Sequence, residues 1–149
     1  MIRKLTVEDL VQAQALFLSV FSKEPWNDQW DTEVQLPKYM VDLMGNSNSL
    51  CFGYEVDGEL IGLSLGYIFH WWQGTDYFVK ELCIDVSKQG SGHGKKFVAE
   101  IEKTLNEDNI KAIWLMTERT VPAYDFYLKN GFSELKDNVM FAKSTCSDQ

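Results

Sequence analysis

The residues best suited to chemistry in this chain of 149 residues lie in one glycine-rich segment, Gln89-Gly90-Ser91-Gly92-His93-Gly94-Lys95-Lys96. The segment joins an expected strand at 77–85 to an expected amphipathic helix at 95–107. Glycines let successive backbone amides converge on an anion, and the start of a helix adds unpaired N–H groups and a positive dipole end. The pattern therefore predicts a pyrophosphate site, with a flexible turn before a helix as the plainer alternative.

Two well-known phosphate loops do not fit this segment. A Walker loop has four residues between its first glycine and a Gly-Lys pair, and Ser or Thr follows that pair. Here Gly90 and Gly94 enclose three residues, and Lys96 follows Lys95. A dinucleotide-binding fingerprint would need glycine at the position of Lys95. The segment therefore belongs to neither class.

The N-terminal part of the chain is predicted to be mainly helical after a short first strand at 2–5. Thr6, with Asp9 three residues later, is typical of a capping box and starts a helix. Helical spacing resumes at 31–44. Pro37 must kink that second helix or open its second half, because proline lacks the N–H that a helix interior requires.

The middle of the chain supplies a hairpin. Asp57-Gly58 predicts a tight turn between strands at 50–56 and 60–69. One face of the return strand carries only small residues, which lets a packed helix or a ligand approach the sheet closely. Those small residues are Gly62, Ser64 and Gly66.

The C-terminal half alternates strands and helices. A strand at 111–117 is apolar on both faces, which indicates a central position. A short helix follows at 122–129, and residues 132–143 offer one or two closing strands. No repeat or linker divides the chain, so we expect one domain at 1–143 and a short polar tail at 144–149.

Composition narrows the class of partner. Fourteen Lys and Arg against 22 Asp and Glu give a net charge of −8, which repels nucleic acid and attracts small cations. No apolar stretch approaches the roughly 20 residues of a membrane helix. The chain reaches Glu8 and Asp9 before any apolar run forms, so it has no pattern of a signal peptide at its start. We therefore expect a cytoplasmic chain without nucleic-acid or membrane partners. The two His and three Cys show no ligand spacing, which predicts no metal site and free thiols.

Two motifs resemble signatures of the GNAT N-acetyltransferase superfamily. Gln89-x-x-Gly92-x-Gly94 is similar to its acetyl-CoA pyrophosphate motif, and Ala123-x-x-Phe126-Tyr127-x-x-x-Gly131-Phe132 is similar to its second signature. The two occur in the family's order. The resemblance implies a single α/β domain whose mixed, mostly antiparallel sheet has six to seven strands, with a splayed central strand pair and about four helices.

The resemblance also implies how acetyl-CoA is held. The strand before the pyrophosphate loop splays away from the next one in this superfamily, and here those strands are 77–85 and 111–117. The cofactor is then held by backbone groups of Leu82, Ile84, Gln89, Gly90, Gly92, His93, Gly94 and Lys95. His93 takes part through its backbone, and we expect its imidazole to face solvent.

Two side chains are candidates for proton transfer. Tyr127 matches the family position whose hydroxyl often protonates the leaving thiolate, with Tyr124 as the fallback and a core-edge tyrosine as the plainer interpretation. Glu81 is the candidate general base, and alternation places it on the opposite face from Leu82. The alternatives are a surface carboxylate beside Lys80 and proton transfer through ordered water.

Two loops, 24–33 and 70–76, are both aromatic and acidic. Their tryptophans can stack on sugar or alkyl faces, and their carboxylates can pair with ammonium groups. The candidate acceptor-binding residues are Trp26, Asp28, Trp30, Trp71, Trp72 and Asp76. In the alternative interpretation the tryptophans fill a core and the carboxylates are solvated or cap the helix near Asp31.

The resemblance implies transfer of the acetyl group of acetyl-CoA to a primary amine. The loop composition favours a small cationic acceptor such as an aminoglycoside or polyamine, and Pro25-Trp26-Asn27-Asp28 is loosely similar to the aminoglycoside N-acetyltransferase branch. A protein or peptide N-terminus is an alternative acceptor, and a non-catalytic acyl-CoA sensor is an alternative function. The resemblance also allows a homodimer formed through the closing strands at 132–143.

Overall fold

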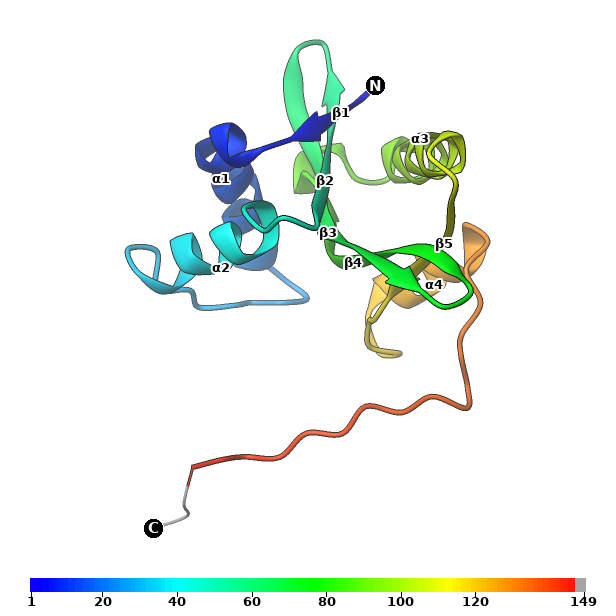
Figure 1. Cartoon of the computed structure of the whole chain (residues 1–149). Coiled ribbons are helices and arrows are strands. Elements are labelled where there is room, and N and C mark those ends of the chain that lie inside the picture. The colour runs from blue at the N-terminus through cyan, green and yellow to red at the C-terminus, as the bar shows by residue number, and fades with distance from the viewer. Residues whose placement is uncertain (147–149) are drawn as a thin grey trace. The chain divides into compact units, whose positions relative to one another are not determined.

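A five-stranded sheet is the centre of the first of two units in the computed structural model, which describes residues 1–146 (Figure 1). The first unit is Met1–Thr117, and the second begins at Glu118. The strands are β1 (Ile2–Leu5), β2 (Ser49–Val56), β3 (Glu59–Trp71), β4 (Gly74–Ile84) and β5 (Ile110–Leu115). Their order in the sheet follows their order in the chain. Neighbours are antiparallel except β4 and β5, which are parallel.

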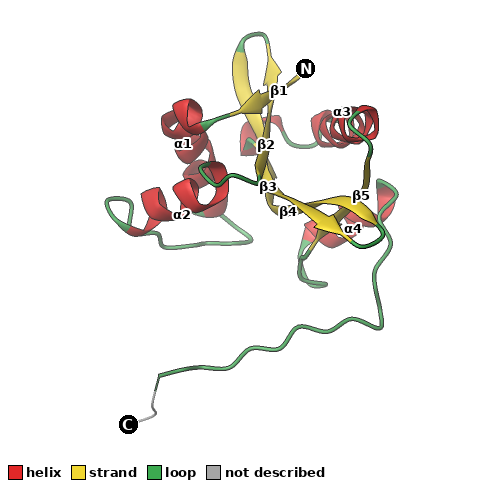
Figure 2. Ribbon diagram, in the orientation of Figure 1, coloured by secondary structure: helices red, strands yellow, loops and turns green. Residues whose placement is uncertain are grey.

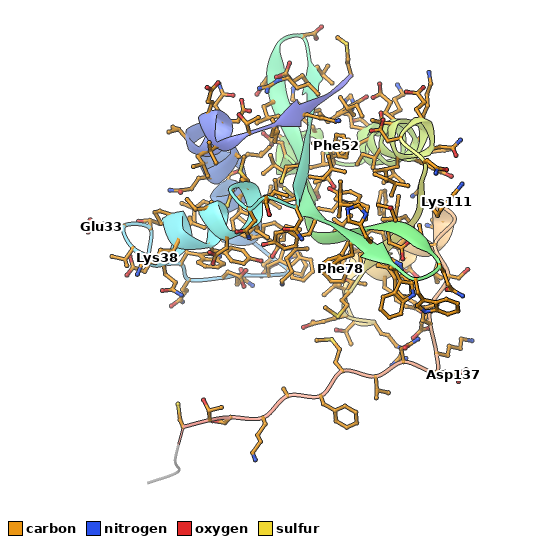
Figure 3. All side chains as sticks on the ribbon, in the orientation of Figure 1. Glu33, Lys38, Phe52, Phe78, Lys111 and Asp137 are labelled. Carbon is orange, nitrogen blue, oxygen red and sulfur yellow. The ribbon has the colours of Figure 1, made fainter. Side chains whose placement is uncertain are left out.

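Helices cover both faces of this sheet. α1 (Leu10–Phe21) and α2 (Gln35–Met44) pack on one face, and α3 (His93–Glu107) packs on the other (Figure 1). One apolar cluster joins Leu63 and Leu65 to α1 and α2. A second joins Phe97 of α3 to Phe52 of β2, whose side chain Figure 3 shows on the α3 side of the sheet. β4 is therefore held between two separate cores.

The first helix begins as the sequence predicts. Thr6 donates its backbone N–H to Asp9 Oδ2 at 2.9 Å and accepts a hydrogen bond from the N–H of Glu8 at 3.2 Å. These bonds cap a short 3₁₀ turn, Val7–Asp9, that leads into α1. The second helix starts later than 31, because Asp31 accepts hydrogen bonds from Glu33 and Val34 in a preceding turn. Pro37 then lies in the first turn of α2, where no helical N–H is needed.

The predicted hairpin is present between β2 and β3. Asp57 and Gly58 have φ values of 52° and 78°, the left-handed pair that a tight two-residue turn requires. On the small-residue face of β3, a Cβ at Gly62 would lie 3.2 Å from the Phe97 ring. Ser64 is fully buried and its hydroxyl lies 2.8 Å from that of Tyr77. A packed helix therefore occupies much of this face.

The sheet has five strands within the described residues, fewer than the six to seven expected. β5 lies at an edge and not at the centre, since it pairs only with β4 among these residues. Ile110, Ile113 and Leu115 pack with the α3 cluster, whereas Trp114 is 43% exposed, so the apolar pattern of β5 does not reflect a central position. Residues 132–143 form no strand in the described part of the chain, and Figure 2 draws them as loop. Strand propensity alone does not create a strand without a partner edge.

The second unit contains α4 (Pro122–Lys129), with proline at the start of the helix as predicted. The residues after it are mostly exposed, including 144–146 of the predicted polar tail. Residues 147–149 of that tail lie outside the described part. The extent of the predicted single domain, 1–143, stays a prediction. Among residues 1–146, no helix has the length and apolar character to cross a bilayer.

Candidate functional site

A β-bulge in β4 sets the geometry of the site. Leu65 of β3 pairs with Glu81, but the next residue, Gly66, pairs with Val79, so Lys80 is an extra residue in β4. A Cβ at Gly66 would lie 2.0 Å from the backbone oxygen of Phe78. Glycine is therefore required opposite the bulge. A bulge bends its strand and increases the local twist, which turns β4 away from its earlier course.

β4 and β5 separate just where this bulge occurs. They pair from Thr75 with Ile110 to Val79 with Leu115, and β5 ends there. β4 continues to Ile84 with β3 alone on its other side. The predicted splayed strand pair is thus present, at the edge of the five-stranded sheet. From Lys80 onward the outer edge of β4 carries backbone groups that no strand of the first unit covers.

Strand geometry identifies which backbone groups face this open edge. The N–H of Asp85 donates to the carbonyl of Ile61 on β3 at 2.7 Å. N–H groups of alternate residues point to the same side of a strand, so those of Cys83 and Glu81 also face β3. The groups of Leu82 and Ile84 face the open edge. These are the two β4 residues that the sequence predicts as backbone contacts for the cofactor, and the geometry is compatible with that prediction.

The loop after β4 is built by short-range hydrogen bonds. The Asp85 carboxylate accepts from the N–H of Ser87 at 2.9 Å, which caps the 3₁₀ turn Val86–Lys88. It also accepts from the Ser87 hydroxyl at 2.8 Å, and the hydroxyl first and the N–H second lower the pKa of Asp85. The side chain of Gln89 donates to the Ile84 carbonyl at 2.9 Å. Gln89 thus ties the loop to the open edge of β4, a structural role for the first residue of the motif.

Gly90 and Gly92 give the loop its final turn. Both have φ of 82°, and a Cβ on either would meet no atom within 4 Å. Residues with a side chain are therefore disfavoured at these two positions by the left-handed backbone, and not by a lack of space. The open space above the backbone leaves room for a ligand to approach the amides directly.

The N-terminus of α3 completes the anion site. Gly92 is the N-cap, and His93, Gly94 and Lys95 are the first three helical residues, whose N–H groups have no partner within a helix. The imidazole of His93 differs from the expectation, because it does not simply face solvent. Its ring lies 6.0 Å from that of Tyr54, and its Nδ1 is buried without a partner among the described residues.

The side chain of Glu81 lies on the face of the sheet that α1 and α2 cover, which adjoins the open edge of β4. The bulge places Lys80 and Glu81 on this same face, where simple alternation would separate them. The hydroxyl of Tyr39 on α2 donates to Glu81 Oε1 at 2.5 Å, and Lys80 Nζ lies 5.9 Å from the centre of the Tyr39 ring. Burial raises the pKa of Glu81, while the hydrogen bond from Tyr39 acts in the opposite direction.

An aromatic cluster surrounds this tyrosine. Trp30 stacks on Tyr39 with ring centres 5.1 Å apart, and Phe17 contacts both rings edge-on. Trp26 packs on Phe21. The first of the two predicted acceptor loops therefore lies beside Glu81, and its tryptophans also belong to the core, as the alternative interpretation has it.

Tyr39 was missed by the sequence reasoning. It follows Leu36 by three residues and precedes Met40 and Leu43, which are buried, so helical spacing places it toward the core. A tyrosine directed toward a core requires a partner for its hydroxyl. That requirement was the signal in the sequence.

The second predicted acceptor loop lies elsewhere. Trp71 and Trp72 are at the tip of the β3–β4 hairpin and are 57% and 80% exposed. Trp71 pairs with Gly74, which precedes Glu81 by seven strand positions, or roughly 20 Å of strand. Asp76 accepts a hydrogen bond from Trp114 Nε1 at 3.0 Å. The structure thus brings Asp28 and Trp30 of loop 24–33 close to Tyr39 and Glu81, places Trp26 against Phe21, and keeps the residues of loop 70–76 away.

The candidate acid lies on α4 in the second unit. The Tyr127 ring contacts those of Phe126 and Phe132. The fallback, Tyr124, donates its hydroxyl to Glu134 at 2.8 Å, and Arg119 donates to the same carboxylate at 2.7 Å. The role predicted for Tyr127 stays a prediction.

The thiols and metal-ligand residues add little to this site. Cys51 and Cys83 are buried, and Cys146 is exposed. Burial raises the pKa of Cys51 to about 11 and that of Cys83 further. Cys83 therefore stays a thiol and suits a small core residue better than a nucleophile. Within residues 1–146, no three His, Cys, Asp or Glu side chains gather as a metal site would require.

Sequence comparison identifies the class of protein. A profile of the acetyltransferase (GNAT) family matches residues 8–132. The chain belongs to the GNAT acetyltransferase family, as its two motifs predict. A search of curated proteins finds no match.

Solved structures share the fold at low sequence identity. An aminoglycoside acetyltransferase from an uncultured soil metagenomic sample, in complex with sisomicin, is 18% identical with a TM-score of 0.77, over 98% of this chain and 96% of its own. A ribosomal-protein-alanine N-acetyltransferase from Brucella melitensis biovar Abortus 2308 is 16% identical with a TM-score of 0.75, over 97% and 99%. Aminoglycoside N-acetyltransferase AAC(6')-Iy in complex with CoA is 16% identical with a TM-score of 0.73, over 98% and 95%. These likenesses establish the fold.

Proposed function

We propose that this protein is an acetyl-CoA-dependent N-acetyltransferase whose acceptor is a primary amine of a small cationic molecule. One observation carries the proposal. Beyond the bulge, the open edge of β4 and the glycine loop offer backbone groups, and the Glu81 carboxylate lies on the adjoining α1/α2 face of the same strand. An acyl donor along the edge and an acceptor amine at the face can then meet at one strand.

The residues on the donor side fit acetyl-CoA. The loop from Gly90 to Gly92 and the first turn of α3 supply amides and a positive dipole end for a pyrophosphate. The backbone groups of Leu82 and Ile84 face the edge along which a pantetheine arm would lie. The cofactor supplies the activated acetyl group as a thioester. Support for this cofactor also comes from AAC(6')-Iy, which shares the fold and was solved with CoA.

The residues on the acceptor side suit an amine. The net charge of −8 attracts cations, and Asp28 and Glu81 lie close enough that Asp28 raises the pKa of Glu81. Trp30 and Tyr39 add aromatic faces beside these carboxylates. An aminoglycoside or a polyamine has the charge and the apolar faces to match.

The reaction forms a carbon–nitrogen bond and breaks the carbon–sulfur bond of the thioester. The attacking amine must lose a proton, and Glu81, directly or through water, is the proposed acceptor of that proton. The leaving thiolate must gain a proton, for which Tyr127 is the proposed donor on the strength of the family motif. A Tyr127→Phe variant should lower kcat with little change in affinity for acetyl-CoA. Tyr124→Phe tests the fallback acid in the same assay, and a full-rate Tyr127→Phe variant would remove the role of Tyr127.

The decisive experiment measures thiol release from acetyl-CoA with aminoglycosides, polyamines, amino acids and short peptides, followed by mass spectrometry of the products. We expect acetylation of a cationic small molecule. Selective acetylation of peptide N-termini would mean that the acceptor is a protein or peptide. Peptides are included in the panel because a ribosomal-protein-alanine N-acetyltransferase shares this fold. Binding of acetyl-CoA without turnover of any amine would favour a sensor.

A further inference from the structure

We propose that Tyr39 is a positioning residue for the transfer reaction: its hydroxyl holds the Glu81 carboxylate in one orientation on the acceptor side of β4 and stabilises its ionised form. The inference rests on the proposed function and assigns a role to a residue outside both sequence motifs. Three observations support it: the way Tyr39 is fixed, the way Glu81 is presented, and the charges that surround them.

Tyr39 is fixed by its neighbours on α2 and in the core. The adjacent Met40 is fully buried and anchors the helix. Trp30 stacks on the Tyr39 ring at an interplanar angle of 21°, and Phe17 contacts the ring from the side with centres 5.9 Å apart. A ring clamped between two aromatic side chains has little freedom to rotate its hydroxyl away from Glu81.

Glu81 is presented by the bulge in β4. Without Lys80 as an extra residue, the strand would not bend at this point. Among residues 1–146, Tyr39 is the hydrogen-bond donor to this carboxylate, and it uses Oε1 at 2.5 Å. Oε2 is left as the oxygen that can accept a proton from an amine or from an intervening water.

The charges around Glu81 show why a donor is needed there. Burial and the negative charge of Asp28 raise its pKa, whereas the Tyr39 hydrogen bond and Lys80 lower it. Cys83 on the same strand stays neutral because burial raises the pKa of its thiol. The pKa of Tyr39 lies well above its usual value, through burial and the nearby Glu81, so the phenol remains protonated and donates at every physiological pH. Tyr67 also faces Tyr39, and its own pKa is raised by burial.

The test is Tyr39→Phe, which keeps the stacked ring and removes the donor. Because the lost hydrogen bond favoured the carboxylate, the pKa of Glu81 should rise by about one unit. The acidic limb of kcat/KM against pH should move upward by the same amount. Carbon-13 NMR of the Glu81 carboxyl, assigned with Glu81→Gln, should report the same shift without any substrate. A purely structural role would change stability without moving the acidic limb of the pH profile.

Tyr67→Phe is the matched control. Tyr67 is a partly buried tyrosine that packs against the same core, but its hydroxyl donates to the backbone carbonyl of Asp42 and not to Glu81. Its removal should leave both the titration and the pH profile in place. In Glu81→Gln, conversely, the Tyr39 phenol should ionise at a lower pH, which ultraviolet difference absorbance detects and which does not depend on Tyr39→Phe folding well.

The outcomes separate this inference from the proposed function. An unchanged Glu81 titration in Tyr39→Phe would overturn the positioning role even if the enzyme acetylates amines. A shifted titration with an unmoved pH profile would mean that Tyr39 holds Glu81 but that Glu81 does not take the proton, which overturns the catalytic half of the inference. Shifts in both confirm it.

Discussion

The open edge and the α1/α2 face of β4 depend on the sequence in different ways. At the open edge, the predicted ligands are backbone groups, and the sequence matters mainly where glycine permits a left-handed turn or a close approach. On the α1/α2 face, the candidate groups are the side chains of Tyr39, Glu81 and Trp30, which come from a helix, a strand and a loop. One region therefore tolerates most substitutions outside its glycines, whereas the other changes with each residue that lines it.

The largest expected effect comes from the glycine loop. Gly92→Val should weaken acetyl-CoA binding by about 100-fold, because a β-branched residue cannot hold φ near 82° without straining the loop. Calorimetric titration with CoA measures this. Gly58→Val is a matched control, since Gly58 has φ of 78° and equal open space in the β2–β3 turn. Both variants should lose about 1–2 kcal/mol of stability. Equal CoA affinities in the two would refute the role of the loop.

A second substitution acts on both sides of β4 at once. Gly66→Ala should cost about 3 kcal/mol, because the new Cβ would overlap the backbone oxygen of Phe78 and force the bulge to change. Both CoA affinity and the Glu81 titration should then shift. Gly62→Ala would place its Cβ 2.8 Å from the end of Ile84, 3.0 Å from Tyr54 Cβ and 3.2 Å from the Phe97 ring, all side-chain atoms, so it should cost less and leave the bulge and the Glu81 titration in place. Denaturant unfolding gives the two stabilities, and a harmless Gly66→Ala would show that the bulge does not set the geometry.

The acceptor side alone should respond to Trp30→Phe. This change removes part of the aromatic face beside Tyr39 and should raise the acceptor KM by roughly 10-fold with CoA affinity unchanged. Trp72→Phe, at the exposed hairpin tip, should change the KM by less than about 2-fold because it lies far along the strand from Glu81. Steady-state kinetics with the best amine of the panel decides between them. A larger effect at Trp72 would move the acceptor site to the hairpin.

The smallest effect should come from a residue that serves neither side. Thr6→Ala removes the side-chain bond of the capping box before the first helix and should lower stability by about 1 kcal/mol without changing kinetics.

The other half of this capping box makes stability depend on pH. The pKa of Asp9 is lowered by the backbone N–H of Thr6 and by Arg3. The contribution of Asp9 to stability is therefore present above the ordinary aspartate pKa and is lost as pH falls through the lowered value. Asp9→Asn should flatten the decline in stability below about pH 4.

Much of the fold could be predicted because it depends on local patterns. The Thr6 cap, the Asp57-Gly58 turn and the inward stripe of α3 each require only neighbouring residues. The donor side of the site was predictable for the same reason, since a glycine loop before a helix is a local feature. The start of α2 was placed too early, because Asp31 caps a separate turn and Pro37 suits the first turn of a helix.

What could not be predicted depends on distant pairings. The edge position of β5 follows from which strands pair, and its apolar pattern does not encode that. Lys80 and Glu81 share a face only because Gly66 pairs with Val79, a shift of register that alternation within β4 cannot reveal. The Tyr39–Glu81 bond joins residues 42 positions apart. The arrangement of Tyr39, Lys80 and Glu81 on the acceptor side could therefore be recognised only in the structure.

The three cysteines set the background of any assay that counts free thiols. Cys51 and Cys83 are buried with raised pKa values, so a thiol reagent reaches them slowly while the chain is folded. Cys146 is exposed and reacts at once. A measurement of released CoA thus begins from about one reactive thiol per chain, and alkylation beforehand removes that signal without entering the core. The same stoichiometry reports unfolding, because the count rises to three when the sheet opens.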